Sequence, residues 1–312
     1  MRILEVAADD YIDELQIAMV EVTQDSAWSA GDSRRVVPSE NYFVHIAQQL
    51  RQEKGRKEGF KVLVFRCAEG RIIRAGLAAG LQIYGADPYD GYHEWYLDEV
   101  AKAGLLDKNV FQMTEGKIPF ADQTFDLVVA NRLEHVSDLD PVLAEIDRVL
   151  RPDGKVLAIF PNANVVWEEH SNTFFTHWFP ANSSIRFPWI YLSKWVGDAL
   201  WKLGLAHVPD LARRSLMGMG ADSEGRTRSE WTRFALWYLD NYCFYRKQAV
   251  IDEAFERYFE VKRFDRSFIA FRRARSRGWR LLTPFPAGWA LNERILRKLI
   301  GVVVLATKAT PA

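Results

Sequence analysis

Short, wholly apolar segments alternate with segments of helical periodicity through the middle of the chain. Runs such as KVLVF, FDLVVA and KVLAIF have the length of buried parallel strands, which are continuously hydrophobic because both faces of the sheet are covered. The predicted strands are Lys61–Phe65, Leu81–Ala86, Val110–Met113, Phe125–Ala130 and Lys155–Phe160. The segments between them place apolar residues at helical spacing, and helices are predicted over 72–79, 92–103 and 141–150. This alternation predicts an α/β fold with a doubly wound, mostly parallel sheet.

The composition limits the classes of protein that this chain can represent. Hydrophobic residues make up 48% of the 312 positions and the formal net charge is zero, so we expect a packed core and no general affinity for nucleic acids. Two cysteines, Cys67 and Cys243, predict neither a disulfide framework nor a metal-ligand cluster, and they favour a reducing cytoplasm. Acidic residues near the N-terminus argue against a signal peptide, and no apolar stretch is long enough for a membrane span.

The first predicted strand, helix and second strand form half of a dinucleotide-type βαβ unit. The turn Arg66–Gly70 follows the first strand, and Asp87 follows the second. In such a unit the turn faces a ligand, and the acid at the end of the second strand accepts hydrogen bonds from ribose hydroxyls. Arg66 and Ala68 stand where glycines are expected. An ordinary βαβ crossover without a ligand therefore stays open on this stretch alone.

The segment from Phe120 to Pro161 carries a more specific pattern. The sequences PFADQTFDLVVANRLEHV and LAEIDRVLRPDGKVLAIFPN closely resemble the class I S-adenosylmethionine-dependent methyltransferases. This resemblance extends over residues 61–162 and implies S-adenosylmethionine as the cofactor. It also implies a Rossmann-like, seven-stranded sheet, for which Tyr258–Phe264 and Gly301–Thr307 are the remaining strands, as an antiparallel pair.

The resemblance implies a role for each matching position. The turn residues Arg66, Cys67, Ala68, Glu69 and Gly70 would lie against the methionine part of the cofactor. Asp87 would bind the ribose hydroxyls, Glu115 with Gly116 the adenine amino group, and Asn131 would flank the methyl-bearing sulfur. Glu134 and His135 are expected to be structural. Arg66 places a cation beside the cofactor's sulfonium, or it pairs with the methionine carboxylate.

The long stretch after the fifth strand predicts a substrate cap. The domains expected are an N-terminal helical segment (1–58), the cofactor-binding core (59–162), a helical, aromatic-rich cap (163–257) and the last two strands (258–312). Most of the eleven tryptophans lie after Pro161, and helices are predicted around 189–203 and 229–245. An insertion of this length at the ligand edge of a sheet is typical of a substrate-binding region.

The start of this cap suggests the acceptor. The segment EEHSNTFFTHWFP resembles methyltransferases of bacterial surface-polysaccharide pathways, which implies a sugar or glycan hydroxyl as the acceptor. A hydroxyl needs a base, and His170 is the first candidate, with Glu169 to orient or replace it and His177 as the second candidate. Trp167 and Trp178 are candidates for stacking on a sugar, although packing is the preferred explanation for any single tryptophan.

Three alternatives remain open from the sequence. A methyltransferase-like protein that has lost catalysis and serves as a binding or scaffold partner is favoured by Arg66 and Ala68. A lipid or quinone acceptor is favoured by the aromatic cap. The stretch WIYLSKWVGDALWKLGL could be an amphipathic helix at a membrane surface, but it lacks a strongly basic face, so cap packing or contact with a second copy of the chain is the preferred interpretation.

Overall fold

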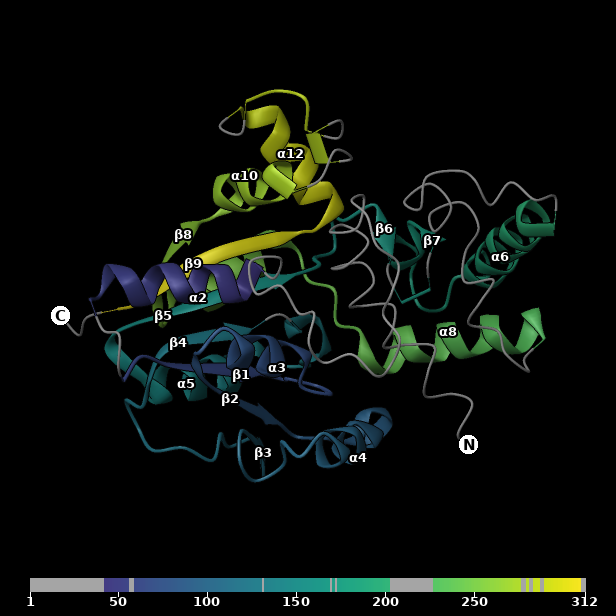
Figure 1. The fold of residues 1–312 in the computed structure, drawn as a ribbon. Coiled ribbons are helices and arrows are strands. Elements are labelled where there is room, and N and C mark those ends of the chain that lie inside the picture. Colours follow the sequence, from purple (N-terminus) through teal and green to yellow (C-terminus); the bar gives the residue numbers. More distant parts are fainter. Residues whose placement is uncertain are drawn as a thin grey trace. The chain divides into compact units, whose positions relative to one another are not determined.

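The computed structural model divides the chain into two units, which are described separately here (Figure 1). The described residues are 42–55, 59–130, 132–168, 170–171, 173–202, 227–275, 279–280, 283–286 and 289–309. The sheet unit comprises the described residues up to 160 together with 248–268 and 302–309; the insert unit comprises those of 161–247 and 269–301. The predicted N-terminal segment before Tyr42 lies outside the described residues.

The sheet unit contains one seven-stranded sheet with the order β3-β2-β1-β4-β5-β9-β8. Its strands are β1 (Lys61–Phe65), β2 (Gln82–Asp87), β3 (Val110–Gln112), β4 (Phe125–Ala130), β5 (Leu150–Phe160), β8 (Phe259–Arg263) and β9 (Val302–Lys308). The first five pair in parallel, and β9 is antiparallel to both β5 and β8. The predicted mostly parallel, seven-stranded α/β sheet is therefore confirmed.

The predicted bounds were least accurate for β5. The segment Arg151–Gly154 was expected to separate a helix from a strand beginning at Lys155, but β5 already begins at Leu150. Leu150 pairs with Phe125, and the register then shifts before Lys155 pairs with Leu127. The proline and glycine end the preceding helix as expected, but an irregular strand pairing accommodates them as well.

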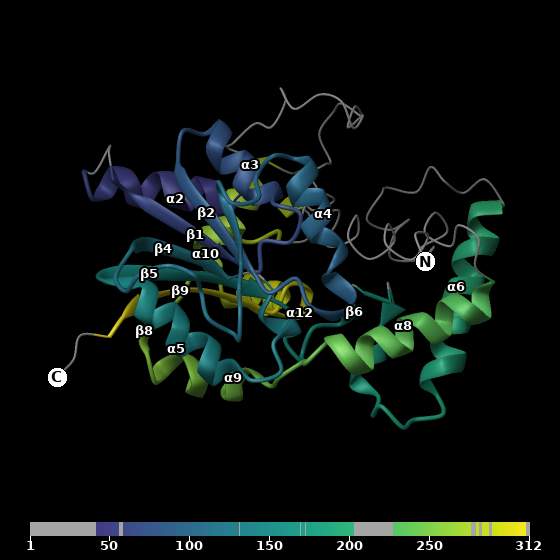
Figure 2. The same cartoon turned by 90° about the horizontal axis from the view of Figure 1, so that it is seen from below.

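Helices cover both faces of this sheet, as Figure 2 shows, with α2 and α3 on one face and α5 and α9 on the other. The helices of the sheet unit are α2 (Tyr42–Glu53), α3 (Arg71–Ala78), α4 (Trp95–Lys102), α5 (Leu139–Val149) and α9 (Gln248–Glu256), with short 3₁₀ turns η3 (Gly91–His93) and η4 (Leu133–His135). Alternate strand residues such as Leu63, Val128 and Val156 pack against Leu143 of α5 and Phe255 of α9. Burial on both faces explains why the strands are continuously apolar.

The insert unit is mostly helical. Its elements are the hairpin β6 (Trp167–Glu168) and β7 (Thr173–Phe174), the turn η5 (Thr176–Trp178), and the helices α6 (Arg186–Lys202), α8 (Arg228–Tyr242) and α12 (Ala290–Leu299); α10 (Asp265–Arg275) begins in the sheet unit and continues into this one. Ile190 of α6 packs with Trp231, Ala235 and Leu239 of α8 in a small core. Within the described residues, every helix is too short or too polar to cross a bilayer.

Candidate functional site

The turn after β1 has the backbone shape of a glycine-rich turn without most of its glycines. Arg66 and Ala68 have φ angles of 52° and 48°, and Gly70 has a φ of 79°. These are left-handed conformations, which cost about 1 kcal/mol for a residue with a side chain. The Arg66 N–H donates to Ala86 O on β2 at 2.8 Å, which fixes the start of the turn. The turn therefore has backbone angles that suit glycine, although only Gly70 is a glycine.

Asp87 closes this turn from the end of the neighbouring strand β2. Its Oδ2 accepts from the Ala68 N–H at 2.9 Å, and its Oδ1 accepts from the Tyr89 N–H at 3.1 Å. Burial raises the pKa of Asp87, and the charges of Arg66 and Arg132 and the two N–H donors oppose this rise. The predicted acid and the predicted turn are thus brought together, with the carboxylate bonded to the turn backbone.

Tyr89 is a residue of this site that the sequence analysis did not single out. It is 3% exposed, and its hydroxyl donates to Ala68 O at 3.0 Å and lies 3.6 Å from Cys67 Sγ. Burial raises the pKa values of both the Tyr89 hydroxyl and the Cys67 thiol, so both are neutral. Tyr89 lies in a loop after β2, and a loop position alone does not predict which way an aromatic ring will pack.

Arg132 is a second missed residue, at the end of β4. It is buried, its Nη1 donates to Tyr96 Oη at 3.2 Å, and its guanidinium lies 5.6 Å from the centre of the Tyr96 ring. The available signal was a charged residue two positions after a buried parallel strand, because strand ends meet at the ligand edge of such a sheet. Asn131, the predicted neighbour of the sulfur, lies outside the described residues.

The predicted adenine contacts lie on an exposed turn that follows β3. Glu115 and Gly116 have φ angles of 53° and 73°, and Glu115 is exposed. Arg148 of α5 holds the segment that follows, because it donates to Ile118 O and Phe120 O, each at 2.9 Å. The turn follows the end of β3, and the adenine contact of Glu115 and Gly116 stays a prediction.

The LEHV segment after β4 is buried, with Glu134 2% and His135 7% exposed. His135 Nε2 lies 3.6 Å from Glu134 Oε1, and the His135 ring packs edge-on against His93, with 5.3 Å between the ring centres. Packing of this kind fits the structural role that was expected of Glu134 and His135.

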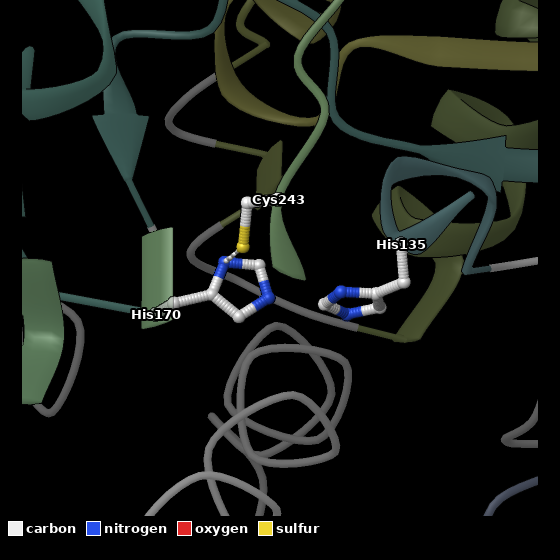
Figure 3. Close-up of side chains that lie close together, drawn as sticks. All are labelled: His135, His170 and Cys243. Atoms are coloured by element: carbon white, nitrogen blue, oxygen red, sulfur yellow. Dashed lines mark hydrogen bonds between the residues drawn. The ribbon is translucent and has the colours of Figure 1, made fainter. Parts of the chain in front are cut away.

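In the insert unit, His170 lies in a buried polar cluster. Its Nδ1 is 2.9 Å from Glu168 Oε1 and 2.9 Å from Tyr245 Oη. The same nitrogen is 3.5 Å from Cys243 Sγ, a contact that Figure 3 shows. Burial lowers the pKa of His170, but Cys243 and Glu168 raise it well above its ordinary value. Burial raises the pKa of Glu168, but the hydrogen bond and charge of His170, with the Ser171 and Tyr245 donors, lower it to about 2.

Glu168, on β6, is fully buried, pairs with Thr173 of β7 and orients His170. Glu169, the predicted partner or replacement of His170, lies outside the described residues, and its role stays a prediction. Tyr245 is the third member of this network, because its hydroxyl donates to Glu168 Oε1 at 2.6 Å.

The remaining predicted acceptor residues also belong to the insert unit. Burial lowers the pKa of His177, whose ring lies 4.6 Å from that of Tyr245. Trp178 is 47% exposed, donates from Nε1 to Val165 O at 2.8 Å and has Lys298 Nζ 5.5 Å from its ring centre. The side chain of Trp167 lies outside the described part of the chain. Trp178 thus offers an exposed ring on a fixed indole, which is the arrangement that stacking on a ligand requires.

Part of the sheet unit is similar to known proteins. Residues 63–158 match the family model described as a methyltransferase domain. Methyltransferase GfsG of Streptomyces halstedii is 33% identical over 115 residues, or 36% of this chain and 41% of that protein. Ubiquinone/menaquinone biosynthesis C-methyltransferase UbiE of Burkholderia multivorans is 31% identical over 116 residues, or 36% of this chain and 46% of that protein. The chain thus spans less than half the length of these two relatives.

A solved structure, that of an S-adenosylmethionine-dependent methyltransferase from Aquifex aeolicus, is 27% identical over 38% of this chain and 64% of that one, with a TM-score of 0.30. Residues 63–158 are thus similar to a methyltransferase domain. The turn and the acid described above both lie within this range.

Proposed function

We propose that this protein is an S-adenosylmethionine-dependent O-methyltransferase whose acceptor is a sugar or glycan hydroxyl. The cofactor part of this proposal is supported by the hydrogen bond between the left-handed turn at Arg66–Gly70 and the carboxylate of Asp87. Such a turn brings backbone close to a ligand, and such an acid accepts from ribose hydroxyls. Both features persist although glycine is present only at Gly70.

The residues of the sheet unit fit an adenosyl group. Each Asp87 oxygen accepts one backbone N–H and retains a lone pair that a ribose hydroxyl can use. The Nε of Arg66 is shielded from solvent and has no hydrogen-bond partner among the described residues, so a polar group is missing beside it. S-adenosylmethionine, when bound, supplies an electrophilic methyl group for transfer to a nucleophile.

The choice of acceptor rests on the insert unit. An alcohol is a weak nucleophile at neutral pH and reacts faster when a base takes its proton. In our proposal His170 is that base and Glu168 and Tyr245 are its positioning residues, because they hold Nδ1 and thereby fix the direction of Nε2. Trp178 is the proposed stacking surface. The EEHSNTFFTHWFP resemblance favours a glycan over other alcohols.

The cofactor half is tested by calorimetric titration with S-adenosylhomocysteine. We expect Asp87→Asn to weaken binding at least 10-fold, because one oxygen acceptor for the ribose is lost. Asp90→Asn is the matched control, since Asp90 lies in the same loop and is exposed, and its affinity should not change. A wild-type protein that binds neither this ligand nor S-adenosylmethionine at millimolar concentration would contradict the proposal and favour the scaffold alternative.

The acceptor half is tested by methyl transfer to oligosaccharides and to a demethylated quinone. We expect transfer to a sugar hydroxyl, with activity rising with pH, because a base whose pKa is raised is unprotonated only above that pKa. Cys243→Ser should shift this rise to lower pH, and His170→Gln should abolish transfer without affecting cofactor affinity. Transfer to the quinone alone would support the second candidate, which the UbiE relative and the exposed Leu192 and Trp195 favour.

A further inference from the structure

Arg66 is the feature of the sheet unit that an adenosine-binding turn does not require. It stands at the end of β1, where the class places glycine, and its left-handed backbone is kept at an energetic cost. Smaller residues fit such a position better, so a guanidinium there needs a compensating interaction. The described protein atoms do not supply one at Nε, which is buried without an acceptor.

The acids near this turn already have cationic neighbours. Glu69 is paired with Arg71 at 2.7 Å between Oε1 and Nε. Asp87 interacts with the charges of both Arg66 and Arg132. Because the Nε of Arg66 has no acceptor among the described residues, this guanidinium is suited to bind a further anion.

We propose that Arg66 binds the α-carboxylate of the amino-acid end of S-adenosylmethionine, and thereby makes this chain selective for ligands that carry that carboxylate. This inference rests on the proposed function and deepens it. A guanidinium presents paired N–H donors that match the two oxygens of a carboxylate, whereas the N–H groups of a glycine turn present one donor each. Binding by charge at Arg66 would replace part of the close backbone approach that glycine permits.

The test compares two ligands that differ in one group. S-adenosylhomocysteine carries the carboxylate, and its decarboxylated analogue lacks it but keeps the amine, the sulfur and the adenosine. Calorimetric titration of the wild-type protein should show the first binding about 10- to 100-fold more tightly, the range expected for a charge-assisted hydrogen bond. In Arg66→Gln this ratio should fall to about 1, with the affinity for the decarboxylated analogue unchanged.

Two further variants keep the test decisive. Arg71→Gln removes a cation from the same turn that is already paired with Glu69, and it should keep the full ratio. Arg66→Gly removes the cation while it suits the left-handed backbone, so it should lose the ratio and unfold at a higher temperature than Arg66→Gln. If Arg66→Gln and Arg66→Gly both remain folded and both lose the ratio, the loss comes from the missing guanidinium and not from a damaged turn.

The outcomes separate the two proposals. If Arg66→Gln keeps the wild-type ratio, Arg66 does not bind the carboxylate, and the proposed function is unaffected. If the wild-type protein prefers neither ligand but binds both, the carboxylate inference is again wrong. If neither ligand binds the wild-type protein, the proposed function itself fails, and this inference fails with it.

Discussion

Two buried carboxylates, one in each unit, have different partners. Asp87 of the sheet unit accepts from the backbone N–H groups of Ala68 and Tyr89. Glu168 of the insert unit accepts from the backbone of His170 and Ser171 and, in addition, contacts the side chains of His170 and Tyr245. Asp87 therefore shapes a turn, whereas Glu168 holds a histidine side chain.

This difference has a consequence for how each unit responds to substitution. Removal of the Asp87 carboxylate leaves two buried backbone donors without an acceptor. Removal of the Glu168 carboxylate leaves backbone and side-chain donors of one network without an acceptor, so a larger loss of stability is expected there.

The largest effect is expected at Glu168. Glu168→Gln should destabilise the insert unit by about 3 kcal/mol, because an amide cannot accept from His170, Ser171 and Tyr245 together. Urea denaturation followed by tryptophan fluorescence measures the change. Glu256→Gln, at an exposed position, is the control and should leave the midpoint where it is. Equal midpoints for the two variants would show that the network contributes nothing.

Acid should act through the same carboxylate. The pKa of Glu168 is about 2 in the folded protein and 4.5 is its ordinary value, so its stabilising contribution is complete above about 4.5. That contribution is lost as the pH falls from about 4.5 towards 2, because the unfolded chain then binds the proton more readily. Thermal unfolding across this pH range should show a weaker dependence on pH in Glu168→Gln than in the wild type.

In the sheet unit, the corresponding test is Arg148→Ala. Arg148 donates to Ile118 O and Phe120 O and pairs with Glu145 at 2.8 Å and with Asp122 at 2.7 Å. We expect a loss of about 2 kcal/mol, since the group is partly exposed and its partners regain water. Hydrogen exchange at the Ile118 N–H should accelerate. An unchanged exchange rate would mean that the segment after β3 does not depend on this arginine.

Arg148→Lys separates charge from geometry at the same position. A lysine keeps the charge, but its ammonium group lacks the planar set of donors with which Arg148 contacts two carbonyls and two carboxylates at once. We expect it to restore less than half of the lost stability, as measured by the same denaturation experiment. Full restoration would indicate that charge alone holds the segment.

The smallest effect is expected in a turn. Gln123 is exposed and has a φ of 52°, so Gln123→Gly should stabilise the sheet unit by about 0.5 kcal/mol. Ala121→Gly, in the same turn but outside the residues with positive φ, should destabilise it by a similar amount. Thermal unfolding of both variants gives the comparison, and the same sign for both would contradict the conformational explanation.

Local sequence was enough to predict most of the sheet unit. β1 and β4 have the predicted bounds, and β2, β3, β8 and β9 lie within a residue or two of them, because buried parallel strands are short apolar runs between turns. The candidate acid Asp87 could be predicted for the same reason: it is the residue that ends such a run. The early start of β5 could not, because it depends on the pairing of Leu150 with Phe125.

The amino-acid sequence was sufficient to predict where the strands lie, which edge of the sheet carries the turn and the acid, and that a family resemblance covers this part. The left-handed backbone of Arg66 and Ala68, the packing of Tyr89 on the turn and the contact of Glu168 with His170 became visible only in three dimensions. The physical reason is that strand formation follows from neighbouring residues, whereas the partner of a buried polar group is chosen by segments distant along the chain: Tyr245 is 75 positions from His170.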